Sequence, residues 1–193
     1  MAPRLLLVDS YDSFAYNVVH ALAALGATVD VVTSDADVSP AGLARYQGIV
    51  IGPGPGTPST NAPLMRAVAR AIETQRPVLG ICLGMQAIVT SYGGTVVAAP
   101  RPVHGEAGDI HHRGAGLFAG LPSPIRAARY HSLCAESATL PKALHVRATS
   151  DDGVIQGVEA VRGRVFGLQF HPESFLSEEG ASLLMNFLMY VRA

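Results

Sequence analysis

The sequence is short of the features that mark several large classes of protein. Only 15% of its 193 residues are charged and the formal net charge is −1, so it lacks the basic clusters typical of proteins that bind nucleic acid or membrane surfaces. Its two cysteines, Cys82 and Cys134, are too few for a disulfide framework, and no signal sequence is recognisable. No apolar run reaches the length of a membrane-spanning helix. We therefore expect no nucleic-acid or membrane partner, and a cytoplasmic, reducing location.

Apolar residues are abundant, at 49% of the chain, which is enough for the core of a single domain over residues 1–193. In the first half, short apolar runs alternate with segments of helical spacing. The predicted strands are residues 4–9, 28–33, 48–51 and 78–81, and the predicted helices are residues 14–25, 41–46, 63–74 and a segment from Cys82 to about residue 92. This alternation predicts an α/β fold with an open, mainly parallel twisted sheet flanked by helices.

The second half has a different pattern, with short strand candidates separated by Gly, Pro and Asp turns. These candidates are residues 95–98, 108–111, 125–130, 144–148, 154–161 and 165–170. We expect them to form antiparallel edge strands on one side of the sheet, together with a small accessory sheet. Residues 177–191 then close the chain as an amphipathic helix whose apolar stripe belongs to the core.

Gly80-Ile81-Cys82-Leu83-Gly84 carries the strongest chemical signal. An apolar strand precedes it and a potential helix follows, which is the strand–turn–helix layout of a nucleophile elbow with sulfur in place of oxygen. The N-terminus of that helix favours the thiolate form of Cys82, and the N–H of Leu83 can face a developing oxyanion. The alternative is a buried structural cysteine, because free cysteine is among the most buried residue types.

A cysteine nucleophile needs a base, and the segment Phe170-His171-Pro172-Glu173 offers one. An apolar strand ends at His171, and Pro172 takes the chain out of the sheet. Residues two apart in an extended chain project to the same side, so Glu173 can orient the imidazole as in a catalytic triad. The alternative is an ordinary surface pair. We predict that the adjacent His111 and His112 lie at the surface and that the chain holds no metal site.

The loop at residues 52–58 alternates glycine and proline, which forbids helix and regular strand pairing. It is therefore a stiff, shaped loop with exposed backbone N–H groups. It follows a predicted buried strand, and open α/β sheets place their ligand sites at such strand ends. It is not a P-loop, since no Gly-Lys-Ser/Thr follows, so we predict a binding loop of another kind.

Four motifs occur in order along essentially the whole chain, and together they resemble the class I (triad) glutamine amidotransferases. They are Gly52-Pro53-Gly54-Pro55-Gly56-Thr57-Pro58, Leu79-Gly80-Ile81-Cys82-Leu83-Gly84-x-Gln86, Arg129-Tyr130-His131-Ser132-Leu133 and Gly167-Leu168-Gln169-Phe170-His171-Pro172-Glu173-Ser174. The start of the chain, Val8 to Phe14, and the Arg-Tyr-His-Ser-Leu segment are similar more narrowly to the glutaminase subunits of anthranilate synthase and aminodeoxychorismate synthase.

The resemblance implies a flavodoxin-like fold and a thioester mechanism. Cys82 would attack the side-chain carboxamide of L-glutamine, with His171 and Glu173 completing the triad and the N–H groups of Leu83 and Gly54 forming the oxyanion hole. Ammonia would pass to a separate synthase subunit that uses chorismate, in tryptophan or folate biosynthesis. This chain would need no cofactor, with magnesium on the partner. The residues implied to hold the substrate are Gly54, Pro55, Gly56, Leu83, Gln86, Ser132 and Leu133.

Two residues depart from the pattern of the family. Met85 stands where the family usually has His, and Glu106 stands where it usually has Lys, in a segment near the side that faces the partner. Neither change touches the implied triad, but the charge reversal at Glu106 points to a different or co-varied synthase. Two other hypotheses stay open: an amidotransferase of another pathway, and a non-catalytic subunit that regulates a partner. We also expect low activity from the isolated chain, because partner binding could set the shape of the 52–58 loop.

Overall fold

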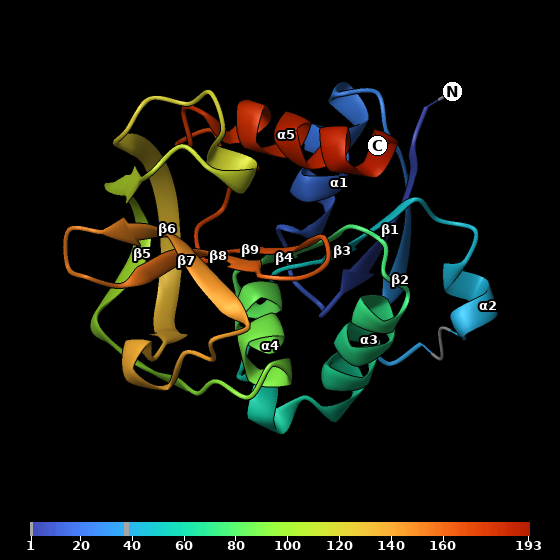
Figure 1. The fold of residues 1–193 in the computed structure, drawn as a ribbon, viewed down its shortest axis with the longest axis horizontal. Helices are drawn as coiled ribbons and strands as arrows, with labels where there is room; N and C mark the ends of the chain where they lie inside the picture. Colours follow the sequence, from blue (N-terminus) through green and yellow to red (C-terminus); the bar gives the residue numbers. More distant parts are fainter. Residues whose placement is uncertain (1, 37–38) are drawn as a thin grey trace.

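A computed structural model describes residues 2–36 and 39–193. Its strands form one nine-stranded sheet in the order β2-β1-β3-β4-β9-β8-β7-β5-β6 (Figure 1). The strands are β1 Arg4–Asp9, β2 Thr28–Thr33, β3 Gly48–Ile51, β4 Val78–Ile81, β5 Val96–His112, β6 Ile125–Ala135, β7 Leu144–Ser150, β8 Ile155–Ala160 and β9 Val165–Leu168. The α-helices are α1 Ala15–Ala24, α2 Pro40–Leu43, α3 Ala62–Glu73, α4 Leu83–Ser91 and α5 Gly180–Arg192.

The parallel half of the sheet is buried on both faces. Helices α1 and α5 cover one face and α3 and α4 cover the other (Figure 1). Every residue of β3, β4 and β9 is buried, as continuous apolar runs in parallel sheets should be. The core consequently divides into two large clusters, one against α1 and α5 and one against α3 and α4. This arrangement confirms the predicted α/β class.

The predicted accessory sheet is wrong, because all nine described strands belong to a single sheet. The antiparallel place predicted for the strand near residue 165 is also wrong. Strand β9 pairs in parallel with β4 at the centre of the sheet, while β8, β7, β5 and β6 extend it in antiparallel order. A short apolar run has the same composition in a parallel and an antiparallel pair, so the sequence could not separate the two.

The candidates at residues 95–98 and 108–111 are parts of one long strand, β5. Pro100, Pro102 and Gly105 lie between them and are typical of strand ends. The structure absorbs them as irregularities, since the register with β6 shifts between Ala98 and Val103 and again between His104 and Glu106. Strand β7 pairs with β5 only over residues 110–112, so the prolines lie where one side of β5 is open and no ladder donor is lost.

The closing helix begins three residues later than predicted, at Gly180 instead of residue 177. Ser177 is instead used as a brace: its hydroxyl donates to the carbonyl of His171 (2.6 Å) and accepts from the N–H of Ala128 (3.0 Å). The segment before α5 is thereby tied to the strand end that carries His171.

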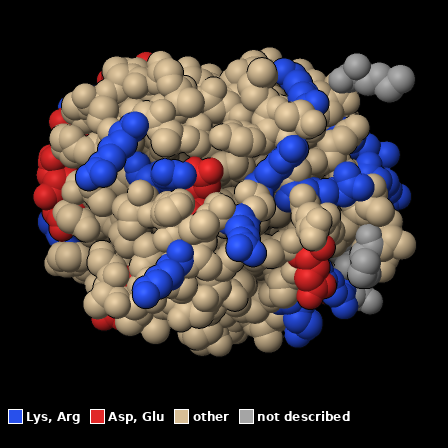
Figure 2. Space-filling view, viewed as in Figure 1, with Lys and Arg blue, Asp and Glu red and all other residues tan. Residues whose placement is uncertain are grey.

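The surface shows an uneven distribution of charge. On the face seen in Figure 2, Lys and Arg side chains outnumber Asp and Glu, with uncharged surface between most of them. None of the helices in the described part of the chain combines the length and apolar character needed to cross a membrane.

Candidate active site

Cys82 lies at a sharp turn between β4 and α4. Its backbone has φ 53° and ψ −107°, a conformation that residues with a side chain rarely adopt. The N–H of Cys82 donates to the carbonyl of Leu168 (2.8 Å), and its carbonyl accepts from the N–H of Gln86 (3.1 Å). The turn is thus fixed to β9 on one side and to the first turn of α4 on the other, with the thiol at the N-terminus of the helix.

The two glycines that flank Cys82 are required by close contacts. A Cβ on Gly80 would lie 2.5 Å from the backbone of Gly84, and a Cβ on Gly84 would collide with the carbonyl of Ile51. Real Cβ atoms essentially never come so close. The Gly-x-Cys-x-Gly pattern therefore allows α4 to pack directly against β3, which is the structural reason for the elbow.

His171 and Glu173 form a buried pair, as the sequence predicts. The Nδ1 of His171 donates to Oε1 of Glu173 (2.6 Å), and the two side chains are 4% and 1% exposed. The predicted extended chain is wrong, however. The N–H of Ser174 donates to the carbonyl of His171 (3.3 Å), so residues 171–174 form a tight turn, and this turn brings the two side chains together.

The electrostatic surroundings of His171 favour its protonated form. Burial alone would lower the pKa of His171, but the side chains of Cys82 and Glu173 outweigh burial and raise that pKa to about 10. The Nε2 atom is buried and makes no hydrogen bond of regular geometry with any described residue, although Cys82 lies close enough to act on it. Such loose contacts are common before substrate binds. At neutral pH the arrangement is a charged imidazolium next to a thiol.

Two aromatic rings hold the imidazole in place, and sequence reasoning gave neither of them a role. Phe14 and Tyr130 contact the His171 ring edge-on, with centroids 5.7 Å and 5.2 Å away. Phe14 stands at the start of α1, where Asp12 accepts its N–H (2.7 Å). The loop after β1 therefore supports the base, in addition to starting the helix.

The cavity in front of Cys82 holds about 200 Å³, at the small end for ligand sites. All seven residues that the resemblance implies for substrate binding line it, together with the nucleophile. Its lining is Gly54, Pro55, Gly56, Cys82, Leu83, Gln86, Tyr130, His131, Ser132 and Leu133. His171 and Glu173 line a neighbouring hollow of about 290 Å³, so they reach the nucleophile from its other side.

Gly54 is packed against the elbow and against the end of β1. A Cβ there would lie 2.6 Å from the Cβ of Ser10 and 2.8 Å from Cδ2 of Leu83. The 52–58 loop can therefore approach Cys82 this closely only with glycine at this position. Sequence reasoning gave Ser10 no contact with this loop; its side chain is buried and its hydroxyl has no hydrogen-bond partner among the described residues.

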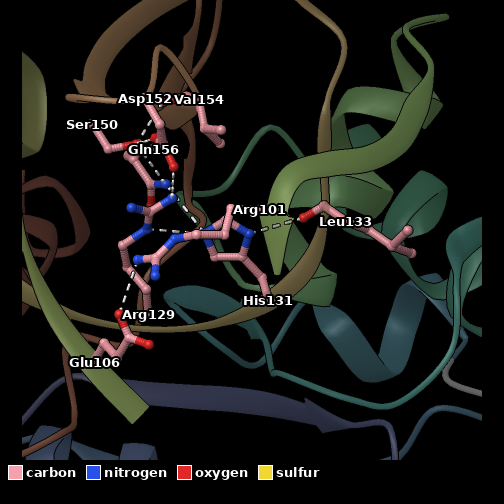
Figure 3. A network of polar contacts seen from close by, with 9 residues as sticks. All are labelled: Arg101, Glu106, Arg129, His131, Leu133, Ser150, Asp152, Val154 and Gln156. Atoms are coloured by element: carbon pink, nitrogen blue, oxygen red, sulfur yellow. Dashed lines mark hydrogen bonds and ion pairs between the residues drawn. The ribbon is translucent and has the colours of Figure 1, made fainter. Parts of the chain in front are cut away.

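A buried polar network supports the far wall of the cavity (Figure 3). Arg129 binds Asp152 (2.8 Å) and donates through Nε to Nε2 of His131 (3.3 Å). Gln156 also contacts that nitrogen (3.2 Å), while Nδ1 of His131 contacts the carbonyl of Leu133 (3.1 Å). Burial and the charge of Arg129 lower the pKa of His131 to about 4. His131 is hence neutral, accepts through Nε2 and donates through Nδ1 to Leu133.

Sequence reasoning missed this network because its members come from separate strands. Asp152 is 23 residues from Arg129, and Gln156 is 25 residues from His131. No local spacing joins them, and each residue alone reads as an ordinary polar position. At the rim, Glu106 pairs with Arg101 (2.9 Å) and both side chains are more than half exposed.

The remaining candidates lie elsewhere. A second cavity of about 210 Å³ lies against α3, but its lining contains neither a cysteine nor a histidine. His111 is half exposed and contacts Asp151 (2.6 Å), and the ring of His112 stacks on Phe118. In the described part of the chain, no three His, Cys, Asp or Glu side chains group as metal ligands would. We therefore assign the site to the cavity at Cys82.

Comparison with known proteins agrees with this assignment. Residues 6–191 match the family model described as "Glutamine amidotransferase class-I". Anthranilate synthase component 2 of Azospirillum brasilense is 46% identical over 97% of this chain and 96% of its own length. Aminodeoxychorismate synthase component 2 of Klebsiella aerogenes is 44% identical over 95% and 98%. The crystal structure of a putative GMP synthase protein from Thermoplasma acidophilum has a TM-score of 0.90 at 25% identity, over 100% and 95%. The chain belongs to the class I glutamine amidotransferase family.

Proposed function

We propose that this chain is the glutamine-hydrolysing subunit of anthranilate synthase, with the equivalent subunit of aminodeoxychorismate synthase as the alternative. The observation that carries the proposal is the meeting of Cys82 with the His171–Glu173 pair beside a cavity of about 200 Å³. Relatives of nearly the same length, 46% and 44% identical, are named as component 2 of these two synthases. A match of this extent favours a shared reaction.

The geometry suggests how each group would act. The Cys82 thiolate attacks the carboxamide carbon of glutamine, and the N–H groups of Leu83 and Gly54 stabilise the oxyanion. His171 gives its proton to the leaving nitrogen, which departs as ammonia and leaves a glutamyl thioester. His171 then takes a proton from water as the water attacks the thioester, which releases glutamate and restores the thiolate–imidazolium pair. Glu173 orients the imidazole and stabilises its positive charge throughout.

The contacts of the cavity suggest how glutamine would be held. Gly54, Pro55 and Gly56 form one side, while Ser132 and Leu133 form the other. Backbone groups on both sides suit the fixed donors and acceptors of an amino acid. Gln86 adds a side-chain amide between them.

The ammonia would pass to a separate synthase subunit that uses chorismate and holds magnesium. This part of the proposal rests on the names of the relatives and on the motif resemblance. The reaction in this chain itself would need no cofactor. Both cysteines are free thiols, which suits a reducing cytoplasmic location.

The proposal is tested by measuring glutamate release from glutamine, with the partner synthase present. Cys82→Ala and Cys82→Ser should abolish the activity, while Cys134→Ala should retain it because that thiol lies outside the cavity. Glutamate release by Cys82→Ala at the wild-type rate would refute the triad. With chorismate and magnesium added, the aminobenzoate-type product identifies the synthase. Glutamine hydrolysis with chorismate untouched would place the chain in another pathway.

A non-catalytic regulatory role is tested with a chloroketone analogue of glutamine. A catalytic Cys82 should be labelled by the analogue, and the label should be found on the peptide that contains Cys82. Protection by excess glutamine would tie the labelling to the cavity. Absence of labelling in a folded protein would favour the regulatory role.

A further inference from the structure

The proposed mechanism leaves one group unused that contacts the nucleophile: the amide of Gln169. This side chain is fully buried, directly after β9. Its Nε2 lies 3.7 Å from Sγ of Cys82, and its Oε1 accepts from Nε2 of Gln86 (3.1 Å). Its backbone N–H donates to the carbonyl of Gln156 (2.9 Å), which fixes its position against β8.

The direction of these hydrogen bonds is determined by the carbonyl of Leu133. A carbonyl can only accept, and it lies 3.2 Å from Nε2 of Gln86. The NH₂ group of Gln86 therefore faces Leu133, and its second hydrogen meets Gln169. Gln169 must present its oxygen to that hydrogen, so its NH₂ group is turned towards the sulfur of Cys82. The opposite orientation would set two NH₂ groups against each other.

We propose that Gln169 is a positioning residue that stabilises the Cys82 thiolate by donating an N–H to Sγ, with its orientation set through Gln86 by the carbonyl of Leu133. The inference rests on the proposed function for its consequence in catalysis. A thiol is a weak acceptor, but hydrogen bonds to an ionised acceptor are about twice as strong as neutral ones, so the contact favours the thiolate. An amide is uncharged and carries no proton to exchange, so it leaves the proton transfer to His171.

Leu133 and Gln86 both line the cavity, and His131 holds the same carbonyl from the other side. The chain of contacts from Leu133 through Gln86 to Gln169 thus joins the substrate wall to the nucleophile. Its members are far apart in sequence, with 47 residues between Gln86 and Leu133 and 87 between Cys82 and Gln169.

The test is the pH dependence of Cys82 alkylation by iodoacetamide, which reacts with thiolate, with the label located by peptide mass. Gln169→Met keeps the length of the side chain and removes the donor. It should move the midpoint of alkylation to higher pH and lower kcat/KM for glutamine roughly tenfold. The matched control is Gln156→Met, which removes an equally buried amide on the neighbouring strand that does not contact sulfur. It should leave the midpoint unchanged.

An unchanged midpoint in Gln169→Met, or an equal shift in Gln156→Met, would overturn the inference. If Gln169→Met does not fold, Gln169→Glu keeps the shape and places an acceptor against sulfur, so its midpoint should also rise. If neither folds, Gln86→Met frees the amide of Gln169 to turn and should shift the midpoint in the same direction; no shift refutes the inference. Alkylation needs no glutamine, so this result stands apart from the glutaminase test with Cys82→Ala.

Discussion

Two buried histidines with opposite pKa shifts predict that the free energy of unfolding has a maximum near pH 6.5. Burial and Arg129 lower the pKa of His131 to about 4. For His171, Cys82 and Glu173 act against burial and raise the pKa above the usual 6.5. Both imidazoles are at least 96% buried by side-chain or residue exposure, so solvent screens neither effect strongly.

The sign of each contribution follows from proton uptake. The unfolded chain protonates His131 as the pH falls through 6.5, but the folded protein does so only near 4, so stability is lost over this window. The gap corresponds to about 3 kcal/mol, lost in full below about pH 4. The contribution of His171 is fully present below 6.5 and is lost as the pH rises towards about 10. Stability therefore falls on both sides.

The measurement is urea unfolding followed by circular dichroism, because the chain has no tryptophan, at a series of pH values. His131→Asn removes the titrating group and retains a donor for the carbonyl of Leu133. The wild-type protein should lose about 3 kcal/mol more than this variant between pH 6.5 and 4. The alkaline limb should be the same in both proteins. Equal slopes on the acid side in the two proteins would refute the assignment of the acid limb to His131.

Three further predictions concern the elbow and the base. Gly84→Ala should destabilise the fold by about 1–3 kcal/mol in urea unfolding, because its Cβ meets a backbone carbonyl of β3; Gly108→Ala, with nothing nearer than 3.4 Å, is the control. Cys82→Gly should be inactive and more stable than Cys82→Ala by about 1 kcal/mol, since glycine relieves the strain at φ 53°; equal melting temperatures would contradict this. Glu173→Gln should lower kcat at least 100-fold and shrink the alkaline limb of His171; an unchanged pH profile would remove Glu173 from the triad.

Much of the site could be predicted because its parts follow neighbouring strands. The 52–58 loop, Cys82 and His171 come after β3, β4 and β9, or within a few residues of them, and these strands lie side by side. A buried apolar run followed by a glycine-rich turn is visible in one sequence. The order β3-β4-β9 is not visible, since β9 is separated from β4 by the whole antiparallel half.

The supporting contacts could not be predicted because none of them is local. The carbonyl of Leu133 receives hydrogen bonds from His131 and from Gln86, which lie on different elements. Prolines in β5 suggested chain breaks because their tolerance depends on which strand neighbours them, a property of the finished sheet. The His171–Glu173 pair was predicted for the wrong reason: a turn and an extended chain can bring the same two residues into contact.

The two departures from the family pattern both lie outside the cavity. Met85 is fully buried, and a Cβ on Gly167 of β9 would lie 2.8 Å from its Cγ, so it fills the core beneath the sheet. Glu106 is exposed and paired with Arg101. A lysine at position 106 would place two positive charges together, so the reversal at Glu106 belongs with Arg101 as one unit of surface charge. Neither difference alters the groups around Cys82.

Chemistry and substrate contacts come from different halves of the sheet. The parallel half supplies the nucleophile, the base and the glycine loop, each at a strand end fixed by two neighbouring strands. The antiparallel half supplies Ser132 and Leu133 on β6, braced by His131, Arg129 and Asp152. Changes in that brace should alter the affinity for glutamine while leaving Cys82 in place, because the only described path between them runs through the side chains of Gln86 and Gln169. That path makes the two glutamines the point at which binding and reactivity are coupled.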